Sequence, residues 1–147
     1  MFNLNSFVPR SSNLKAVIKN QLKKSIMALH NDLGVKGEGI AKIYLEENGY
    51  EILDENWVYG KAEVDLIAYR DGIMVFVEVK TRTSTAFGMP EEFVQKAKQK
   101  QMELASLQYI EIMNHQNDIR FDIIAIVFKK DNTYKLKHIE DAFWPED

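Results

Sequence analysis

The chain has 147 residues, a hydrophobic share of 46% and a net charge of −3, which fits one globular domain. It contains no cysteine, so disulfide bonds and thiolate metal sites are excluded and a reducing, cytoplasmic location is favoured. Its longest apolar run, Ile123 to Phe128, is too short to span a bilayer, and we expect no membrane partner.

Positive charge is concentrated near the start of the chain. Residues 1–31 contain five basic residues and no acidic one, so the remaining residues carry a net charge of −8, which argues against strong non-specific DNA binding. From Leu14 to Ile26, apolar residues recur at helical spacing with lysines between them. This pattern predicts a basic amphipathic helix, of a kind that binds a membrane surface or nucleic acid. We expect residues 1–30 to form a loosely packed basic extension and residues 31–147 to form one domain.

The first helix of this domain is predicted over residues 34–48, where Gly49 supplies its C-terminal stop. Glu38 precedes Ala41 by three positions and Leu45 by seven, so it belongs to the face that points toward the core. Its carboxylate can therefore reach the sheet. The alternative is an N-terminal acid that complements the helix dipole. Tyr50 to Val58 follow as a predicted edge strand.

Residues 63–80 are predicted to form two strands joined by an Asp-Gly turn, because this dipeptide between apolar, β-branched runs is a strong hairpin signal. The second strand is apolar on both faces, as is typical of a central, buried strand. Since side chains alternate along a strand, Glu78 and Lys80 share one face, and Glu63 and Asp65 share a face of the partner strand. The hairpin therefore gathers two or three carboxylates and one ammonium group at one end of the sheet.

Burying these charges is costly unless partners offset their desolvation. One interpretation is a divalent cation between Asp65 and Glu78, since carboxylate oxygens suit Mg²⁺ or Mn²⁺. Lys80 would then orient the attacking water or stabilise developing negative charge. The alternative is a structural ion pair from Lys80 to Glu78 or Asp65, which leaves the other carboxylates repelling one another.

Residues 81–85 are predicted to form a polar loop beside these acids. Its hydroxyl groups, including that of Thr81, and the guanidinium group of Arg82 are candidates for holding phosphates; a solvated loop is the alternative. A long helix is then predicted from Pro90 or Glu91 to about residue 113. Lys98 lies at the margin of its inner face, so it is the lysine most able to bend toward the sheet.

Ile119 to Phe128 are predicted to form the next strand, and Tyr134 to His138 a short edge strand. Arg120 and Asp122 share one face of the longer strand. We prefer a structural ion pair here, or Arg120 bracing one of the acids, to a catalytic role. The three histidines show no metal-ligand spacing and are interpreted as incidental.

Asp65, followed on the next strand by Glu78-Val79-Lys80, resembles the PD-(D/E)XK nuclease signature, although Val64 stands where that signature has proline. A wider set of motifs, between about residues 31 and 128, resembles the YraN family of small bacterial proteins, whose endonuclease fold is similar to that of archaeal Holliday-junction resolvases. These motifs are Gly37-Glu38, Asn48-Gly49-Tyr50, Glu63 to Ala68, Phe76 to Arg82, Phe87-Gly88 and Arg120-Phe121-Asp122. Met27 to Gly34 also look like the usual start of this family, which favours an upstream extension or a misassigned start codon for residues 1–26.

The resemblance implies an α/β fold with a restriction-endonuclease-like αβββαβ core, in which a mixed central sheet begins with three antiparallel strands and is flanked by helices. It also implies a Mg²⁺- or Mn²⁺-dependent endonuclease that hydrolyses nucleic-acid phosphodiester bonds, with branched DNA as a candidate substrate. Resemblance to dimeric resolvases slightly favours a homodimer. The implied catalytic residues are Asp65, Glu78, Lys80 and Glu38; the metal ligands Asp65, Glu78 and the Val79 carbonyl; the supporting residues Glu63, Lys98 and Arg120; and the nucleic-acid contacts Thr81, Arg82 and Lys98.

Two other classes of function fit the same residues. One is a nuclease-fold module that binds branched or single-stranded nucleic acid without cutting it. The other is a protein-interaction scaffold, which the negative charge of the domain suggests. Metal dependence separates the first from an enzyme, because an enzyme loses cleavage without Mg²⁺ or Mn²⁺ whereas a binding module keeps its affinity.

Overall fold

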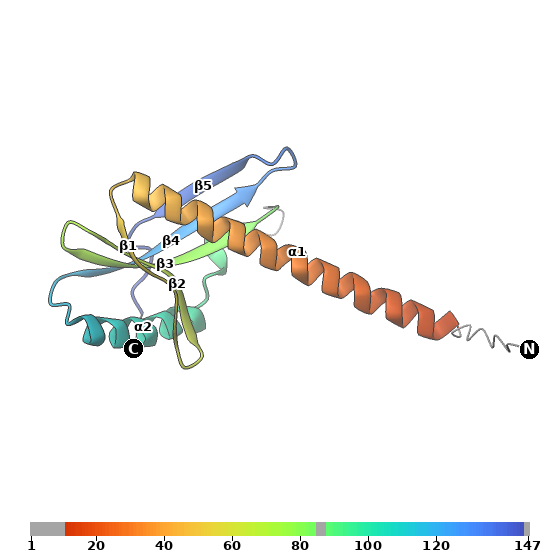
Figure 1. Cartoon of the computed structure of the whole chain (residues 1–147), viewed down its shortest axis with the longest axis horizontal. Helices are drawn as coiled ribbons and strands as arrows, with labels where there is room; N and C mark the ends of the chain where they lie inside the picture. Colours follow the sequence, from red (N-terminus) through yellow and green to blue (C-terminus); the bar gives the residue numbers. More distant parts are fainter. Residues whose placement is uncertain (1–10, 85–87, 146–147) are drawn as a thin grey trace, which may run out of the picture. The chain divides into compact units, whose positions relative to one another are not determined.

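The computed structural model describes residues 11–84 and 88–145 (Figure 1). The elements are α1 (Ser11–Glu47), β1 (Glu51–Tyr59), β2 (Ala62–Arg70), β3 (Ile73–Arg82), the 3₁₀ helix η1 (Pro90–Phe93), α2 (Lys96–Met113), β4 (Ile119–Phe128) and β5 (Tyr134–Ile139). The contacts divide the chain into two units, with the boundary between Asp32 and Leu33. The sheet, α2 and the last part of α1 belong to the second unit.

The five strands form one mixed sheet in the order β1-β2-β3-β4-β5. Strands β1, β2 and β3 are antiparallel, β4 runs parallel to β3, and β5 is antiparallel to β4. The turn between β2 and β3 places Asp71 (φ 53°) and Gly72 (φ 81°) in the left-handed region, as a two-residue hairpin turn requires. The predicted hairpin, the central position of β3 and the α/β fold with a mixed sheet are confirmed.

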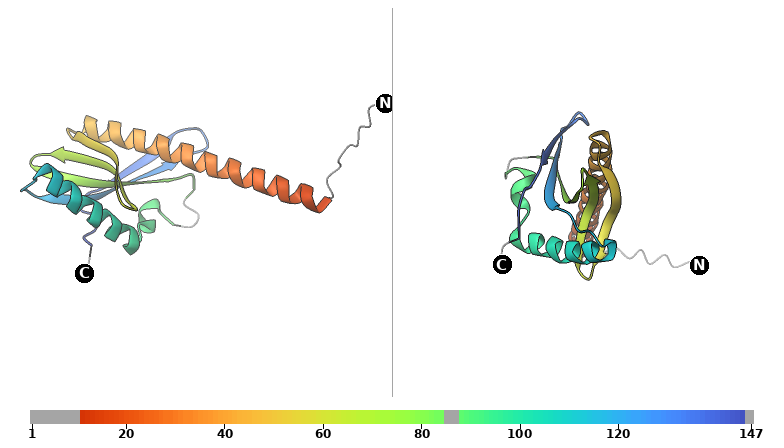
Figure 2. Two further views of the ribbon diagram at one scale, coloured as in Figure 1. Left: turned by 60° about the horizontal axis from the view of Figure 1, so that its bottom comes forward. Right: turned by 90° about the vertical axis from the view of Figure 1, so that its left-hand side faces the viewer.

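Each face of the sheet is covered by one helix (Figure 2). Val75 and Val77 of β3 pack with Ala41 and Leu45 of α1, and we call this side the α1 face. Phe76 packs with α2 side chains on the opposite side, which we call the α2 face; these side chains are Met102, Ala105 and Tyr109. Odd-numbered residues of β3 therefore point to the α1 face and even-numbered residues to the α2 face.

Gly37 marks the closest approach of α1 to the end of β3. Gly37 is buried, and a Cβ atom added to it would overlap the hydroxyl group of Thr81. This contact fixes the part of α1 that carries Glu38 against the strand that carries Glu78 and Lys80.

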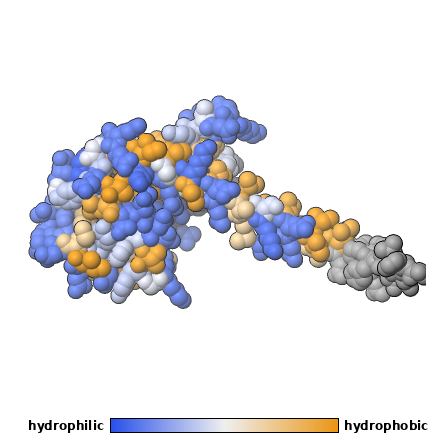
Figure 3. Space-filling model, in the orientation of Figure 1, coloured by the Kyte–Doolittle hydropathy of each residue, from blue (hydrophilic) through white to orange (hydrophobic). Residues whose placement is uncertain are grey.

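The two helices expected over residues 14–26 and 34–48 are one continuous helix in the structure. No proline interrupts this stretch, and the glycines within it lower helix propensity by only about 1 kcal/mol each. Residues 14–32 are exposed throughout, including the predicted apolar stripe from Leu14 (49% exposed) to Ile26 (47%). Both hydrophobic and hydrophilic side chains therefore lie on the surface of this segment (Figure 3).

The helix expected from Pro90 or Glu91 is broken into η1 and α2, because Gln95 adopts an extended conformation between them (φ −70°, ψ 157°). Apolar periodicity predicts Leu104 and Ile112 on the inner face of this helix, and the structure corrects this. Ser106 is buried and donates its hydroxyl proton to the Glu103 carbonyl (2.7 Å), whereas Leu104 and Ile112 are more than half exposed. A local hydrogen bond thus satisfies a buried serine that apolar periodicity alone cannot identify.

Candidate metal and catalytic site

Asp65 lies near the start of β2 and is 9% exposed. The β2–β3 register runs from Arg70 opposite Ile73 to Leu66 opposite Val77, and Asp65 follows at that end. Its Oδ2 atom accepts a hydrogen bond of 2.8 Å from the Val79 backbone N–H. The Asp65 side chain therefore links β2 to β3 at the open end of the hairpin, opposite the turn.

Glu78 is 4% exposed and lies on the α2 face of β3, beside two ammonium groups. The Lys80 Nζ atom is 3.3 Å from Glu78 Oε1, and the Lys98 Nζ atom is 3.2 Å from Glu78 Oε2. Lys98 extends from the first turn of α2 and also donates to the Glu63 carbonyl (2.9 Å). The expected bend of Lys98 toward the sheet is observed.

Glu38 and Glu63 approach one another at the edge of this cluster. Asn56 of β1 lies between them; with its amide nitrogen turned toward the carboxylates, it donates to Glu38 Oε2 and to Glu63 Oε1, each at 3.2 Å. Asn56 adopts a left-handed conformation (φ 50°), which asparagine tolerates better than most residues. Asn56 was not predicted to be a site residue, since a single asparagine in an edge strand carries no functional signal.

Burial and mutual repulsion raise the pKa values of two acids in this cluster, Asp65 and Glu38. Burial, together with repulsion from Glu78, raises the pKa of Asp65 to about 8, although the Val79 N–H and Lys98 oppose the shift. Burial also raises the pKa of Glu38; the hydrogen bond from Asn56 opposes this, while Glu63 and Glu78 add repulsion. Two like charges that share a buried site are expected to behave in this way.

The structure brings together six of the residues singled out in the sequence: Glu38, Glu63, Asp65, Glu78, Lys80 and Lys98. Thr81 points instead to the α1 face, where it meets Gly37. Arg82 is exposed and donates to the Thr81 carbonyl (2.9 Å). Thr85 of the expected polar loop and Phe87 of the family motifs lie outside the described residues.

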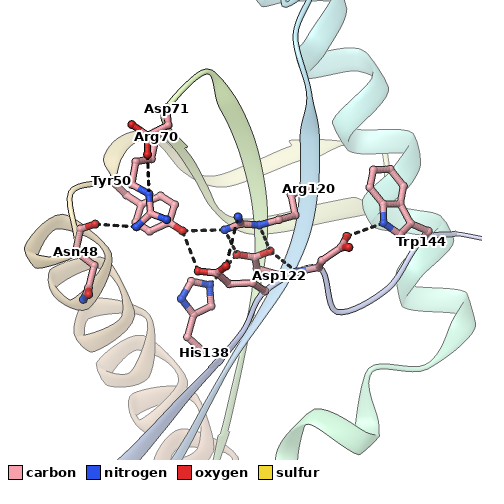
Figure 4. A network of polar contacts seen from close by, with 10 residues as sticks. Asn48, Tyr50, Arg70, Asp71, Arg120, Asp122, His138 and Trp144 are labelled. Atoms are coloured by element: carbon pink, nitrogen blue, oxygen red, sulfur yellow. Dashed lines mark hydrogen bonds and ion pairs between the residues drawn. The ribbon is translucent and has the colours of Figure 1, made fainter.

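Arg120 belongs to a different network, on the α1 face (Figure 4). Its Nε and Nη2 atoms each donate to Asp122 at 2.8 Å, and Nη2 also donates to the Tyr50 hydroxyl (2.8 Å). The His138 Nε2 atom lies 2.7 Å from Asp122 Oδ2. Arg120 thus braces Asp122, as the preferred structural interpretation expected, rather than the acids of the α2 face. His138, interpreted from the sequence as incidental, belongs to this network; its partner lies 16 residues away on the neighbouring strand.

Asp122 is fully buried, and its hydrogen-bond partners compensate the desolvation of its carboxylate. Burial alone would raise its pKa, but hydrogen bonds from His138, Arg120 and the Asp141 backbone together hold the pKa below its ordinary value. This contrasts with Asp65, whose partners do not compensate its burial. The two buried aspartates therefore differ: Asp122 has a complete set of hydrogen-bond partners, whereas Asp65 has one backbone donor and a repelling carboxylate beside it.

The cluster around Asp65 fits a Mg²⁺ or Mn²⁺ ion by its donor chemistry. Within the described residues the buried Glu78 Oε2 atom accepts no hydrogen bond, although Lys98 lies nearby. In residues 11–84 and 88–145, no three His, Cys, Asp or Glu side chains form a group that would hold a metal. Two carboxylates with water or phosphate oxygens completing the shell are, however, the usual environment of Mg²⁺.

No helix in the part of the chain that the structure describes is long and apolar enough to cross a membrane.

Comparison with known proteins identifies close relatives over most of the chain. A family model described as "Uncharacterised protein family UPF0102" matches residues 37–126. A UPF0102 protein of Flavobacterium psychrophilum is 47% identical over 118 residues, which cover 80% of this chain and 98% of the relative. UPF0102 proteins of Bacteroides thetaiotaomicron and Rhodococcus opacus are 42% and 41% identical, over 81% and 80% of this chain and 98% and 100% of their own lengths.

Proposed function

The chain belongs to the UPF0102 family, also known as the YraN family, and from this premise we propose that it is a metal-dependent endonuclease that hydrolyses nucleic-acid phosphodiester bonds. One observation carries the proposal. Asp65 and Glu78 are both buried at one end of the sheet and repel each other, and the pKa of Asp65 is raised in consequence. A fold gains no stability from a buried acid that its partners compensate as poorly as they compensate Asp65, and such acids are concentrated where proteins bind cations or perform catalysis.

Asp65 and Glu78 would hold the cation, with the Val79 carbonyl as a further ligand. A bound Mg²⁺ or Mn²⁺ ion supplies a Lewis acid for the scissile phosphate and lowers the pKa of water. Glu38 and Glu63 would assist through the hydration shell of the ion.

The lysines would act on the substrate. The Lys80 ammonium group, next to Glu78, can orient the attacking water by hydrogen bonding and stabilise the negative charge that develops on the phosphate. The hydrogen bond from Lys98 to the Glu63 carbonyl holds the Lys98 ammonium group next to Glu78, where the phosphate would bind. Together with Arg82, Lys98 would contact the nucleic-acid backbone, whereas Thr81 packs against Gly37 on the α1 face and Arg120 would support the sheet from that face.

We further propose DNA as the nucleic acid, branched DNA as its form, a homodimer as the assembly and the cytoplasm as the location. The location agrees with the cysteine-free sequence. Dimer formation is measured by light scattering coupled to gel filtration.

The proposal is tested with a panel of duplex, flap, four-way-junction and single-stranded substrates, incubated with Mg²⁺, Mn²⁺ or EDTA. We expect cleavage of at least one substrate with metal and none in EDTA. Asp65→Asn, Glu78→Gln and Lys80→Ala should each reduce the rate at least 100-fold. Glu111→Gln and Lys100→Ala are matched controls, because both residues are exposed on α2, and they should cleave like the wild type. Absence of cleavage across the whole panel would contradict the proposal.

A second candidate function is a binding module, and the ion pairs favour it. Lys80 and Lys98 already neutralise Glu78, as a purely structural cluster would require. Such a module would bind nucleic acid equally well in EDTA and in Mg²⁺, and Asp65→Asn would not affect that affinity.

A further inference from the structure

A groove with a basic rim lies beside the candidate site. Its volume is about 460 Å³, and it is bordered by η1 on one side and by β4 and β5 on the other. Three of its lining residues are lysines, all exposed: Lys129, Lys135 and Lys137. The apolar lining includes Pro90, Ala125 and Val127.

The strand register places this groove directly next to Glu78 and Lys80. Lys80 pairs with Ala125 and Arg82 pairs with Val127 across β3 and β4. Across β4 and β5, Ala125 pairs with Lys137, and Val127 pairs with Lys135. Paired residues on neighbouring strands point to the same face, so two parallel rows cross the α2 face, each with a basic residue on β3, an apolar residue on β4 and a lysine on β5.

This concentration of positive charge stands out in the domain after residue 31, which is acidic as a whole. Lysines on an edge strand such as β5 also discourage pairing between copies of a protein. Protection of an edge strand, however, explains neither the groove nor its third lysine, Lys129, which follows β4. A groove that continues the line of Lys80 and Arg82 is suited to an anionic ligand that extends from the candidate site.

The apolar floor indicates what form this ligand takes. A duplex presents phosphates to a protein surface and keeps its base faces stacked inside. An unpaired strand presents phosphates together with exposed base faces, which lie against non-polar surfaces. Lysines on the rim and apolar side chains on the floor are the complement of an unpaired strand.

We infer that the groove lined by Lys129, Lys135 and Lys137 binds an unpaired nucleic-acid strand that continues from the scissile phosphate held near Glu78 and Lys80. The inference rests on the proposed function for its direction. It specifies the substrate class further, as nucleic acid that is single-stranded on one side of the cleaved bond. Lys135 and Lys137 would contact successive phosphates, and the more exposed apolar lining residues, Met89 and Val127, would contact the bases.

The test compares two double variants that lose the same charge. Lys135→Gln with Lys137→Gln removes two groove lysines, and Lys61→Gln with Lys100→Gln removes two exposed lysines outside the groove lining. The affinity of each full-length protein for a fluorescently labelled single-stranded oligonucleotide is measured by anisotropy in EDTA over a range of salt concentrations. Thermal melts verify that both variants are folded.

We expect the groove variant to bind the strand at least tenfold more weakly than the control variant. Its slope of log K against log salt should be smaller by about 1.4, which corresponds to two lost phosphate contacts on a single strand. Affinity for a blunt duplex of equal length should fall by the same small factor in both variants.

Equal single-strand affinities and slopes in the two variants would overturn the inference. A matching loss of duplex affinity in the groove variant would overturn it too, in favour of a duplex-binding surface. Because binding is measured in EDTA, the result does not depend on cleavage. Cleavage by the wild type with no groove effect would remove this inference and leave the proposed function in place. A groove effect without any cleavage would leave the groove as a binding site for an unpaired strand and remove the proposed function.

Discussion

The two buried aspartates of the sheet, Asp65 and Asp122, have pKa values shifted in opposite directions. Asp122 accepts hydrogen bonds from Arg120, His138 and the Asp141 backbone, whereas Asp65 accepts one from the Val79 backbone and faces Glu78. A carboxylate with a complete set of partners stabilises a fold, and one without them destabilises it in the ionised form. The same substitution, aspartate to asparagine, should therefore have opposite effects at the two positions.

Asp65→Asn should stabilise the metal-free protein. In the folded state the pKa of Asp65 is raised to about 8, from its ordinary value of 3.8, so between roughly pH 4 and pH 8 the folded state binds more protons than the unfolded state. Wild-type stability should therefore fall as pH rises through this window, by at most about 1.4 kcal/mol per pH unit for one proton. Asparagine removes this dependence. Denaturant melts in EDTA between pH 5 and pH 9 measure it, and a variant less stable than the wild type at pH 8 would contradict the account.

Asp122→Asn should destabilise the protein by about 3–5 kcal/mol at pH 7, because it leaves the Arg120 guanidinium group partly buried without its counter-charge. The folded-state pKa of Asp122 is lowered, so its contribution is present above the unfolded pKa and is lost as pH falls through the folded pKa. The difference between wild type and variant should therefore shrink below about pH 4. The same melts, extended to pH 3, test this, and a loss under 1 kcal/mol at pH 7 would show that the network is dispensable.

Secondary-structure elements were predictable where the signals are local. The Asp-Gly turn and the doubly apolar β3 identified the hairpin and its central strand, and helix phase identified Lys98 as the lysine that reaches the sheet. The break at Gln95 was not predictable, since neither proline nor glycine marks it. Asn56 and His138 were not predictable either, because their partners come from other strands and helices.

Gly37→Ala tests how α1 is held against β3. Alanine gains about 1 kcal/mol in helix propensity over glycine, but its Cβ would overlap the Thr81 hydroxyl, and overpacking costs about 1–3 kcal/mol. We expect a net loss of stability, relieved by adding Thr81→Ala. Gly39→Ala is the control, because its Cβ meets no atom within 4 Å and should stabilise the helix. Equal effects of Gly37→Ala and Gly39→Ala on a urea melt would rule out the close contact.

At the scale of the whole molecule, family membership and topology were recoverable from the sequence, since the ordered motifs lie at the ends of strands that the topology brings together. The charge pattern was only partly recoverable. Lysines on β5 and on the segment after β4 lie far in the sequence from Lys80, and only the sheet register places them on its face. The acidic domain thus combines a carboxylate pair with a local basic groove, as the proposed action on an anionic polymer would require.

If Asp65 and Glu78 form a cation site, a calorimetric Mn²⁺ titration at pH 8 should detect it. We expect saturable binding by the wild type, loss of that binding in both Asp65→Asn and Glu78→Gln, and retention in Glu111→Gln. We also expect proton release on binding below pH 8, because a cation favours the ionised form of Asp65. No binding by the wild type, or equal binding by all four proteins, would contradict the account and leave Glu78 and its two lysines as a structural ion-pair cluster.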